Sequence, residues 1–166
     1  TLGTQKKATG EVMAISRSFE CALQKALHSL EENKTSLLMS EYTEKSCDEL
    51  LKLLKNIDNT RLYVVAASIY NGISLGKIHD ITKIDMWFLS KLKNLADLEA
   101  YLADGELTCE KYDLAKKYGY LDSTIERMSG QKCPKRTRAV FKMVDTCAGE
   151  FKAETPYFYS TYDEEN

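Results

Sequence analysis

The segment TKIDMWFLSKLKNLADLEAYLADG, residues 82–105, is the most regular part of the sequence and decides the fold class. Thr82 and Asp85 have the spacing of a capping box, in which side chains satisfy the first free amides of a helix. Lys93 and Asp97 lie four residues apart, so they can support a helix on its exposed face. Apolar residues recur at helical spacing and predict one buried stripe: Ile84, Phe88, Leu92, Leu95 and Leu102.

Glycines separate this helix from two shorter ones. Gly105 ends the long helix, because glycine readily adopts the left-handed conformation that closes helices. A helix capped by Thr108 and stopped at Gly119 is expected next, followed by one capped by Asp122 and stopped at Gly130.

Two more helices are predicted before the long segment. SCDELLKLLKN opens with a capping box from Ser46 to Glu49. TRLYVVAASIYNG, residues 60–72, is apolar on nearly every face, which predicts a central buried helix. The Val64–Val65 pair leaves a strand open as the alternative, because β-branched residues favour strands.

The N-terminal part predicts a strand followed by a helix. GEVMAIS, residues 10–16, has the pattern of a short buried strand, and Ser18 is the expected N-cap of the next helix. Residues 33–45 lose this periodicity and are interpreted as a connection. The fold class is therefore mainly α: an orthogonal multi-helix domain, with five or six helices over about 46–130, and a short N-terminal strand–helix unit. The expected apolar stripe of the first helix is Phe19, Leu23, Ala26, Leu27 and Leu30.

Composition limits the class of protein. The 166 residues are 43% apolar and 29% charged, which suits one compact domain or one domain plus a fragment. A net charge of −2 gives no global attraction to nucleic acid or anionic lipid. No apolar run approaches the roughly 20 residues of a membrane span, and the N-terminus lacks a signal-peptide core. Five scattered cysteines without CxxC spacing, with only two histidines, argue against disulfide and zinc frameworks and favour a reducing cytoplasm.

The sequence carries none of the common catalytic motifs for phosphate, dinucleotide, zinc or acyl chemistry. His28 and His79 are interpreted as packing or surface residues, and Cys147 as a small packing residue. Asp80 and Asp85 are interpreted as turn and capping residues rather than a carboxylate pair. No catalytic, cofactor-binding or metal-binding residue is therefore predicted.

One cluster has both a structural and a functional interpretation. The basic run KCPKRTR, residues 132–138, can contact phosphate, but a solvated loop is favoured in an acidic protein.

Trp87 is expected to be a core anchor of the long helix. In the tail TPYFYSTYDEEN, Tyr157 and Tyr159 are expected to be at least half buried. Residues from Tyr162 onward are expected to be exposed, mobile or held by a neighbouring molecule. The residues expected to anchor the structure are Ser46, Thr82, Asp85, Trp87, Phe88, Asp145, Tyr157 and Tyr159.

Three blocks of the sequence resemble one family. GEVMAIS with RSFECALQKALHSLE is similar to the GEVMAIGR and EALQKALRSLE stretch of the large chain of carbamoyl-phosphate synthase. ITKIDMWFLSKLKNL is similar to the LTxIDRWFL helix of that family, and VDTCAGEFKAETPYFYSTYDEEN to its VDTCAAEF and YSTYE blocks. Lys6, Ser16 and Met86 depart from the Met, Gly and Arg that are usual in the family.

The resemblance implies a domain division. Residues 1–32 would be the last strand and helix of the first ATP-grasp half, 33–155 the helical oligomerisation domain, and 156–166 a linker toward the second synthetase half. It also implies a ligase that makes carbamoyl phosphate from bicarbonate, glutamine-derived ammonia and two ATP. The cofactors of the complete enzyme would be ATP and Mg or Mn, with none bound by this segment. Glu11 would line the passage for carbamate, and the isolated segment is expected to be inactive.

The implied partners are the two ATP-grasp halves of the same chain, a glutaminase subunit or domain, and a second copy through self-association, with neither nucleic acid nor membrane. Two alternatives remain open. One is a free-standing helical adaptor whose basic stretch 132–142 contacts nucleic acid or a protein partner. The other is a small independent enzyme, which the absence of catalytic motifs disfavours.

Overall fold

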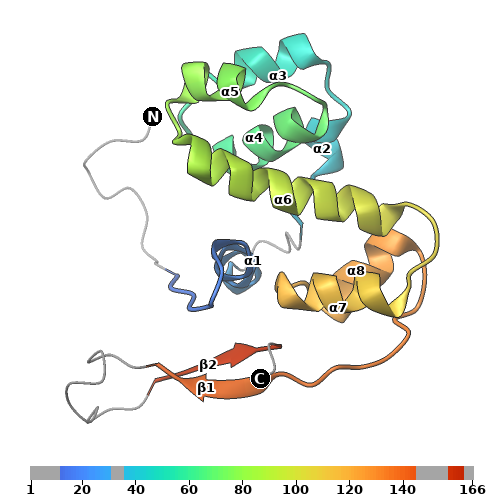
Figure 1. Cartoon of the computed structure of the whole chain (residues 1–166). Helices are drawn as coiled ribbons and strands as arrows, with labels where there is room; N and C mark the ends of the chain where they lie inside the picture. Colours follow the sequence, from blue (N-terminus) through green and yellow to red (C-terminus); the bar gives the residue numbers. More distant parts are fainter. Residues whose placement is uncertain (1–11, 31–35, 145–156, 163–166) are drawn as a thin grey trace.

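The computed structural model describes residues 12–30, 36–144 and 157–162, and within them the protein is mainly helical (Figure 1). A small two-stranded sheet completes the described secondary structure. This confirms the predicted fold class. The elements are α1 (Phe19–Ser29), α2 (Ser40–Thr43), α3 (Cys47–Leu53), α4 (Arg61–Tyr70), α5 (Leu75–Thr82), α6 (Met86–Ala103), α7 (Cys109–Lys117), α8 (Asp122–Ser129), β1 (Val140–Met143) and β2 (Phe158–Thr161).

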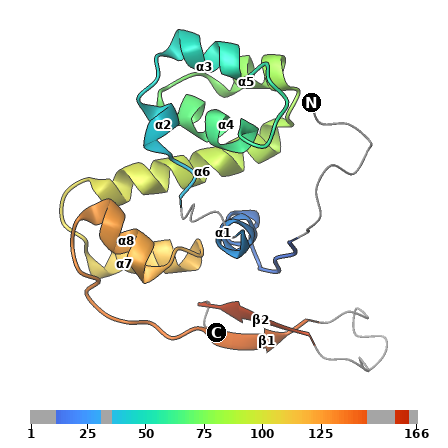
Figure 2. The ribbon, with the colours of Figure 1, turned by 180° about the vertical axis from the view of Figure 1, so that it is seen from behind.

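The long helix α6 crosses the middle of the molecule and divides it into two groups of helices (Figures 1 and 2). Helices α2 to α5 lie on one side of it, and α1, α7 and α8 lie on the other side. The two strands lie beyond α1 and α7, at the edge of the molecule. Residues 46–130 hold α3 to α8, so the expected cluster of five or six helices is confirmed with six.

Helix α4 forms the centre of the core. Seven consecutive residues, from Tyr63 to Ile69, are buried. A helix in water normally keeps one polar face, so burial on every side requires neighbours all round. Helices α2, α3, α5 and α6 supply these neighbours. This confirms the central buried helix and excludes the strand that the Val64–Val65 pair left open.

The start of α6 differs from the predicted capping box. Thr82 is the last residue of α5, where its hydroxyl donates a 2.7 Å hydrogen bond to the Ile78 carbonyl. Lys83 then adopts a left-handed conformation, with φ of 58°, which ends α5. Asp85 is the N-cap of α6, and its carboxylate accepts a 2.8 Å bond from the Trp87 amide. The prediction for Thr82 was wrong because two helices meet here within three residues, and the threonine closes the first.

Other helix ends follow the sequence more closely. The capping box of Ser46 and Glu49 is present at the start of α3. Thr108 caps α7 by accepting a bond from the Lys111 amide. Asp122, however, is the first residue of α8 rather than its cap, since the cap position is Leu121 and has no side-chain bond. The Asp122 carboxylate instead accepts bonds from the side chains of α7.

The N-terminal unit differs from the prediction in two respects, and the connection that follows it differs in one. Residues 12–16 do not form a strand, and Met13 is 81% exposed. A strand needs a hydrogen-bonding neighbour, and β1 and β2 pair only with each other in the described sheet. Helix α1 begins as expected, with Ser18 accepting a bond from the Cys21 amide. Its buried residues are Glu20, Cys21, Gln24 and Leu27, so only Leu27 of the predicted stripe is fully buried, although Leu23 is partly buried against the core. The connection 33–45 contains the short helix α2.

Strands β1 and β2 pair antiparallel, with Val140 opposite Thr161 and Met143 opposite Phe158. Residues directly opposite each other point to the same side of a sheet. Phe141, Met143 and Phe158 therefore share one side, and they are 72%, 57% and 61% exposed. The other side carries Tyr159 and Thr161, which are more buried. No described residue of either strand belongs to the buried core cluster of the helices.

Candidate functional site

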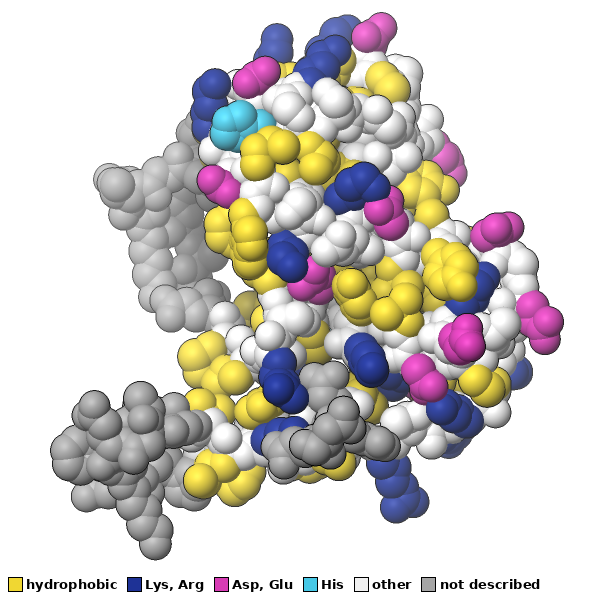
Figure 3. Space-filling view, viewed as in Figure 1, with side chains coloured by type: hydrophobic (Ala, Val, Ile, Leu, Met, Phe, Trp, Pro, Cys, Tyr) yellow, Lys and Arg dark blue, Asp and Glu magenta, His cyan; other side chains and the backbone are white. Residues whose placement is uncertain are grey.

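An aromatic cluster joins the beginnings of α1 and α6. The rings of Phe19, Trp87 and Phe88 contact one another edge to face, with centroid separations of 5.0 to 5.5 Å. Trp87 is 51% exposed and Phe88 is 43% exposed, so neither lies in the core. The neighbouring Met86 is also 43% exposed. These four residues are named here the aromatic surface, and hydrophobic side chains are prominent on the face that Figure 3 shows.

The helical phase explains why Trp87 was wrongly expected to be a core anchor. The buried residues of α6 begin at Leu89 and continue through Leu92, Leu95 and Leu102. Trp87 and Phe88 precede this stripe in the first turn, where α1 covers only part of the helix. Contiguous exposed apolar groups of this kind often mark an interaction surface. The predicted stripe was correct at Leu92, Leu95 and Leu102, whereas Ile84 is only partly buried.

Charged groups border the aromatic surface. Lys91 lies 5.4 Å from the centroid of the Trp87 ring and 3.3 Å from the carboxylate of Glu20. Asn94 donates a 2.8 Å hydrogen bond to the same carboxylate. Although burial alone would raise the pKa of Glu20, these two partners lower it below its usual value. The polar side of α1 is therefore bound to α6 by a charged pair, which explains why this side is buried.

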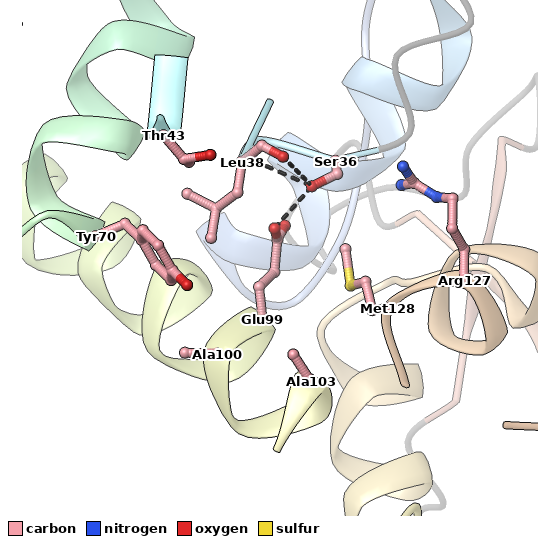
Figure 4. Close-up of a pocket in the computed structure, with 9 residues that line it drawn as sticks. All are labelled: Ser36, Leu38, Thr43, Tyr70, Glu99, Ala100, Ala103, Arg127 and Met128. Carbon is pink, nitrogen blue, oxygen red and sulfur yellow. Dashed lines mark hydrogen bonds between the residues drawn. The ribbon is translucent and has the colours of Figure 1, made fainter. Parts of the chain in front are cut away.

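A second feature is a buried carboxylate on α6 that the sequence reading missed. Glu99 is 4% exposed, and it accepts a hydrogen bond from Ser36 Oγ at 2.7 Å (Figure 4). It also accepts one from the Tyr120 hydroxyl at 2.8 Å. The Leu37 amide donates a third bond. Burial raises the pKa of Glu99, although the Ser36 and Tyr120 bonds oppose this change. Burial and the nearby Glu99 charge together raise the pKa of Tyr120.

The signal for Glu99 was present in the sequence. Residues 92, 95, 99 and 102 have helical spacing, so Glu99 lies on the same stripe as three buried leucines. A carboxylate at such a position is buried and needs hydrogen-bond partners. Those partners come from the segment before α2 and from the turn between α7 and α8. The Glu99 carboxylate therefore connects three parts of the chain that are distant in sequence.

A small pocket of about 200 Å³ adjoins this carboxylate (Figure 4). Its lining residues come from the segment before α2, from the ends of α2 and α4, and from α6 and α8. Within the described residues, no group of three or more histidines, cysteines or acidic residues could hold a metal ion. The residues that line the pocket are Ser36, Leu38, Thr43, Tyr70, Glu99, Ala100, Ala103, Arg127 and Met128.

The tail residues are held against the helices by lysines. The Lys25 ammonium donates to the Ile15 carbonyl at 3.1 Å and to the Ser160 carbonyl. Tyr159 is largely buried, as predicted, but Tyr157 is 56% exposed and that prediction was wrong. Tyr162 was expected to be exposed, mobile or held by a neighbouring molecule, yet it is partly buried within this chain, with its ring centroid 4.5 Å from Lys116 Nζ.

The remaining candidate residues are accounted for by packing and ion pairs. His79 Nδ1 lies 2.7 Å from the Ile84 carbonyl, and burial together with the charge of Lys116 lowers the pKa of His28. In the basic run, Lys132 pairs with Glu126 and Lys135 pairs with Asp113, each at 2.9 Å. The adaptor interpretation, which relied on this run, is not supported. Glu11, Asp145 and Cys147 lie outside the described residues.

No described helix combines the length and the apolar character that a membrane crossing requires. The comparisons with known proteins point to one family. Residues 11–143 match the model of the carbamoyl-phosphate synthetase large chain, oligomerisation domain. The chain is 44% identical to the carbamoyl phosphate synthase large chain of Lachnoclostridium phytofermentans and 43% identical to that of Agathobacter rectalis, in both cases over all of its residues. It is 40% identical over 99% of its residues to the same protein of Clostridium acetobutylicum.

The chain spans about 16% of the length of each of these relatives. The match to the family model covers the helices α1 to α8 and strand β1, and strand β2 follows it. The chain therefore belongs to the carbamoyl-phosphate synthetase large chain family and contains its oligomerisation domain.

Proposed function

We propose that this chain serves as the helical interdomain and self-association module of a carbamoyl-phosphate synthase large chain. The observation that carries the proposal is the exposed aromatic surface. It lies on a domain that matches the family model of an oligomerisation domain. Residues 1–32 would complete the first ATP-grasp half, 33–155 form the module, and 156–166 lead toward the second half. Glu11 would lie beside the carbamate passage between the halves.

The complete protein would make carbamoyl phosphate from bicarbonate, ammonia and two ATP, in the cytoplasm. Glutamine would supply the ammonia through a glutaminase subunit or domain, and ATP with Mg or Mn would bind in the ATP-grasp halves. An enclosed passage protects an intermediate such as carbamate from water. The role of this module would be to hold the two halves and a second copy in place, and the chain alone would have no bicarbonate-dependent ATPase activity.

Sedimentation velocity over a range of concentrations tests the self-association. We expect a reversible dimer at high concentration, because a single domain provides less contact area than a whole large chain. The double substitution W87A/F88A should shift the equilibrium toward monomer by roughly tenfold, since aromatic residues dominate interface energies. A matched control is Tyr101→Ala, which removes a 49% exposed aromatic ring from the other end of α6.

A strict monomer at every concentration would contradict self-association of the chain through this surface. Equal dimerisation of the wild type, the double variant and the control would place the contact elsewhere on the domain. Turnover of ATP by the purified chain above a heat-inactivated control would contradict the proposal that this chain alone has no ATPase activity.

A further inference from the structure

Strand β2 lies against the helical domain but outside its buried core. It follows the segment that matches the oligomerisation domain, and it contributes no described residue to the buried core cluster. A groove of about 460 Å³ lies between β2, α1 and the turn after α7. Pairing with β1 sets the register of β2 within the two-stranded sheet, but the position of β2 on the helices depends on further contacts, because neither strand joins the buried core.

The first contact is made by Lys25 of α1. Its ammonium donates to the Ser160 carbonyl of β2 and to the Ile15 carbonyl of the N-terminal segment. The same ammonium lies 5.7 Å from the centroid of the Tyr159 ring. Hydrogen bonds from a charged donor are stronger than those between neutral groups. Because the bond reaches a main-chain carbonyl, it fixes the position of the strand along its length.

The second contact is made by Lys116 of α7. Lys116 is 4% exposed, and its ammonium lies 2.7 Å from Asp122 and 3.2 Å from the Tyr120 carbonyl. The centroid of the Tyr162 ring lies 4.5 Å from the same ammonium. A cation on an aromatic face is worth most where water is excluded. The contact made by Lys116 therefore depends on the aromatic side chain of Tyr162.

We infer that Lys25 and Lys116 form a clamp that sets the register and direction of β2 on the helical domain. One lysine binds the main chain at Ser160 and the other binds the ring of Tyr162, two residues further along. A shift of one residue would turn the Tyr162 side chain to the other face of the strand. The clamp thus decides where the chain leaves the oligomerisation domain, and this role does not depend on the proposed activity.

The described residues offer a matched control on the same helix. Lys111 of α7 is 7% exposed, and its ammonium lies 4.3 Å from the centroid of the Tyr101 ring. It donates to the carbonyls of Tyr101 and Asp104, and no contact joins it to β2. A substitution of Lys111 therefore removes a buried ammonium–tyrosine contact of the same kind without touching the clamp.

Hydrogen–deuterium exchange of the full 166-residue chain, read by mass spectrometry, tests the inference. In K25M, K116M and Y162L, the amides of 157–162 should exchange roughly threefold to tenfold faster than in the wild type, as expected for the loss of one such contact. Y162F keeps the ring but removes the hydroxyl that also interacts with Lys116, so exchange should rise less than in Y162L. K111M should leave exchange of 157–162 unchanged.

Exchange of α4 and α6 separates a positional role from a general loss of stability. It should stay at the wild-type rate in K25M and Y162L, since neither side chain belongs to the core. If K116M accelerates exchange of α4 and α6 as well, that variant cannot separate a positional role from a general loss of stability. K25M and Y162L then provide the test, because both leave the Lys116–Asp122 pair intact. Wild-type exchange of 157–162 in both of these variants would overturn the clamp.

Discussion

Trp87 and Leu95 lie on the same helix, but their side chains have different surroundings. Leu95 is completely buried, whereas Trp87 is 51% exposed in the aromatic surface. Leu95→Ala should therefore lower the free energy of unfolding by about 2–5 kcal/mol, because a cavity remains. Trp87→Ala should lower it by only about 1 kcal/mol, through lost ring contacts. Urea denaturation followed by circular dichroism compares the two, and a larger cost for Trp87→Ala would place the tryptophan in the core.

Glu99 makes stability depend on pH. Burial raises the pKa of its carboxyl in the folded protein above the ordinary value of 4.5. The folded state then holds a proton that the unfolded chain releases, so the contribution is fully present below about pH 4.5. It is lost as the pH rises through the raised folded pKa. Relative to Glu99→Gln, the wild type should therefore become less stable as the pH increases.

Chemical denaturation at a series of pH values checks this expectation. The Gln side chain has almost the same shape but does not ionise, so it removes the titration while keeping most of the packing. The difference in free energy of unfolding between wild type and Glu99→Gln should fall with rising pH and then become constant. A difference that rises with pH would mean that the folded-state pKa of Glu99 is lowered.

At the scale of elements, the turn between α7 and α8 strongly favours glycine at one position. Gly119 has φ of 89°, and a Cβ there would lie 3.1 Å from Cys21 Sγ and 3.2 Å from the Cys21 carbonyl oxygen. Gly119→Ala should cost about 2–3 kcal/mol, from left-handed strain and from displacement of α1. Gly130 has φ of 67° and open space around it. Gly130→Ala should cost about 1 kcal/mol, from strain alone. Equal melting temperatures of the two variants would show that α1 does not pack closely on this turn.

At the scale of the whole molecule, the tail and the helical domain should separate on truncation. A chain that ends at Thr155 lacks β2, so it loses the burial of Tyr159, Thr161 and Tyr162. The loss should be on the order of 2 kcal/mol at about 25 cal/mol per Å² of apolar area. Helical circular dichroism should remain nearly unchanged, because the core cluster contains no described strand residue. A chain that ends at Tyr162 is the control and should melt like the parent.

Collapse of the helical signal in the shorter truncation would contradict this view, since it would make the strands part of the folding core. An unchanged melting temperature would instead show that β2 is only loosely attached to the helices.

The sequence by itself determined the type and approximate place of six of the eight described helices, whereas α2 and α5 were not predicted. Periodic apolar residues, capping side chains and glycines act within a few residues of one another, so the local pattern was sufficient for α3, α4, α6 and α7. The three family blocks were also local and were enough to identify the family. The spacing of Glu99 within the leucine stripe of α6 was visible as well, although it was not recognised.

Only the tertiary structure decided which residues of α1 and of the first turn of α6 face inward. Trp87 is exposed and Glu20 is buried because α1 crosses α6 at its first turns, and no local pattern encodes that crossing. The pairing of β1 with β2 and the contacts of Lys25 and Lys116 join residues that are tens of positions apart or more. Such contacts depend on how the helices pack around α6, because packing places distant residues within the few ångströms over which hydrogen bonds and ring contacts act.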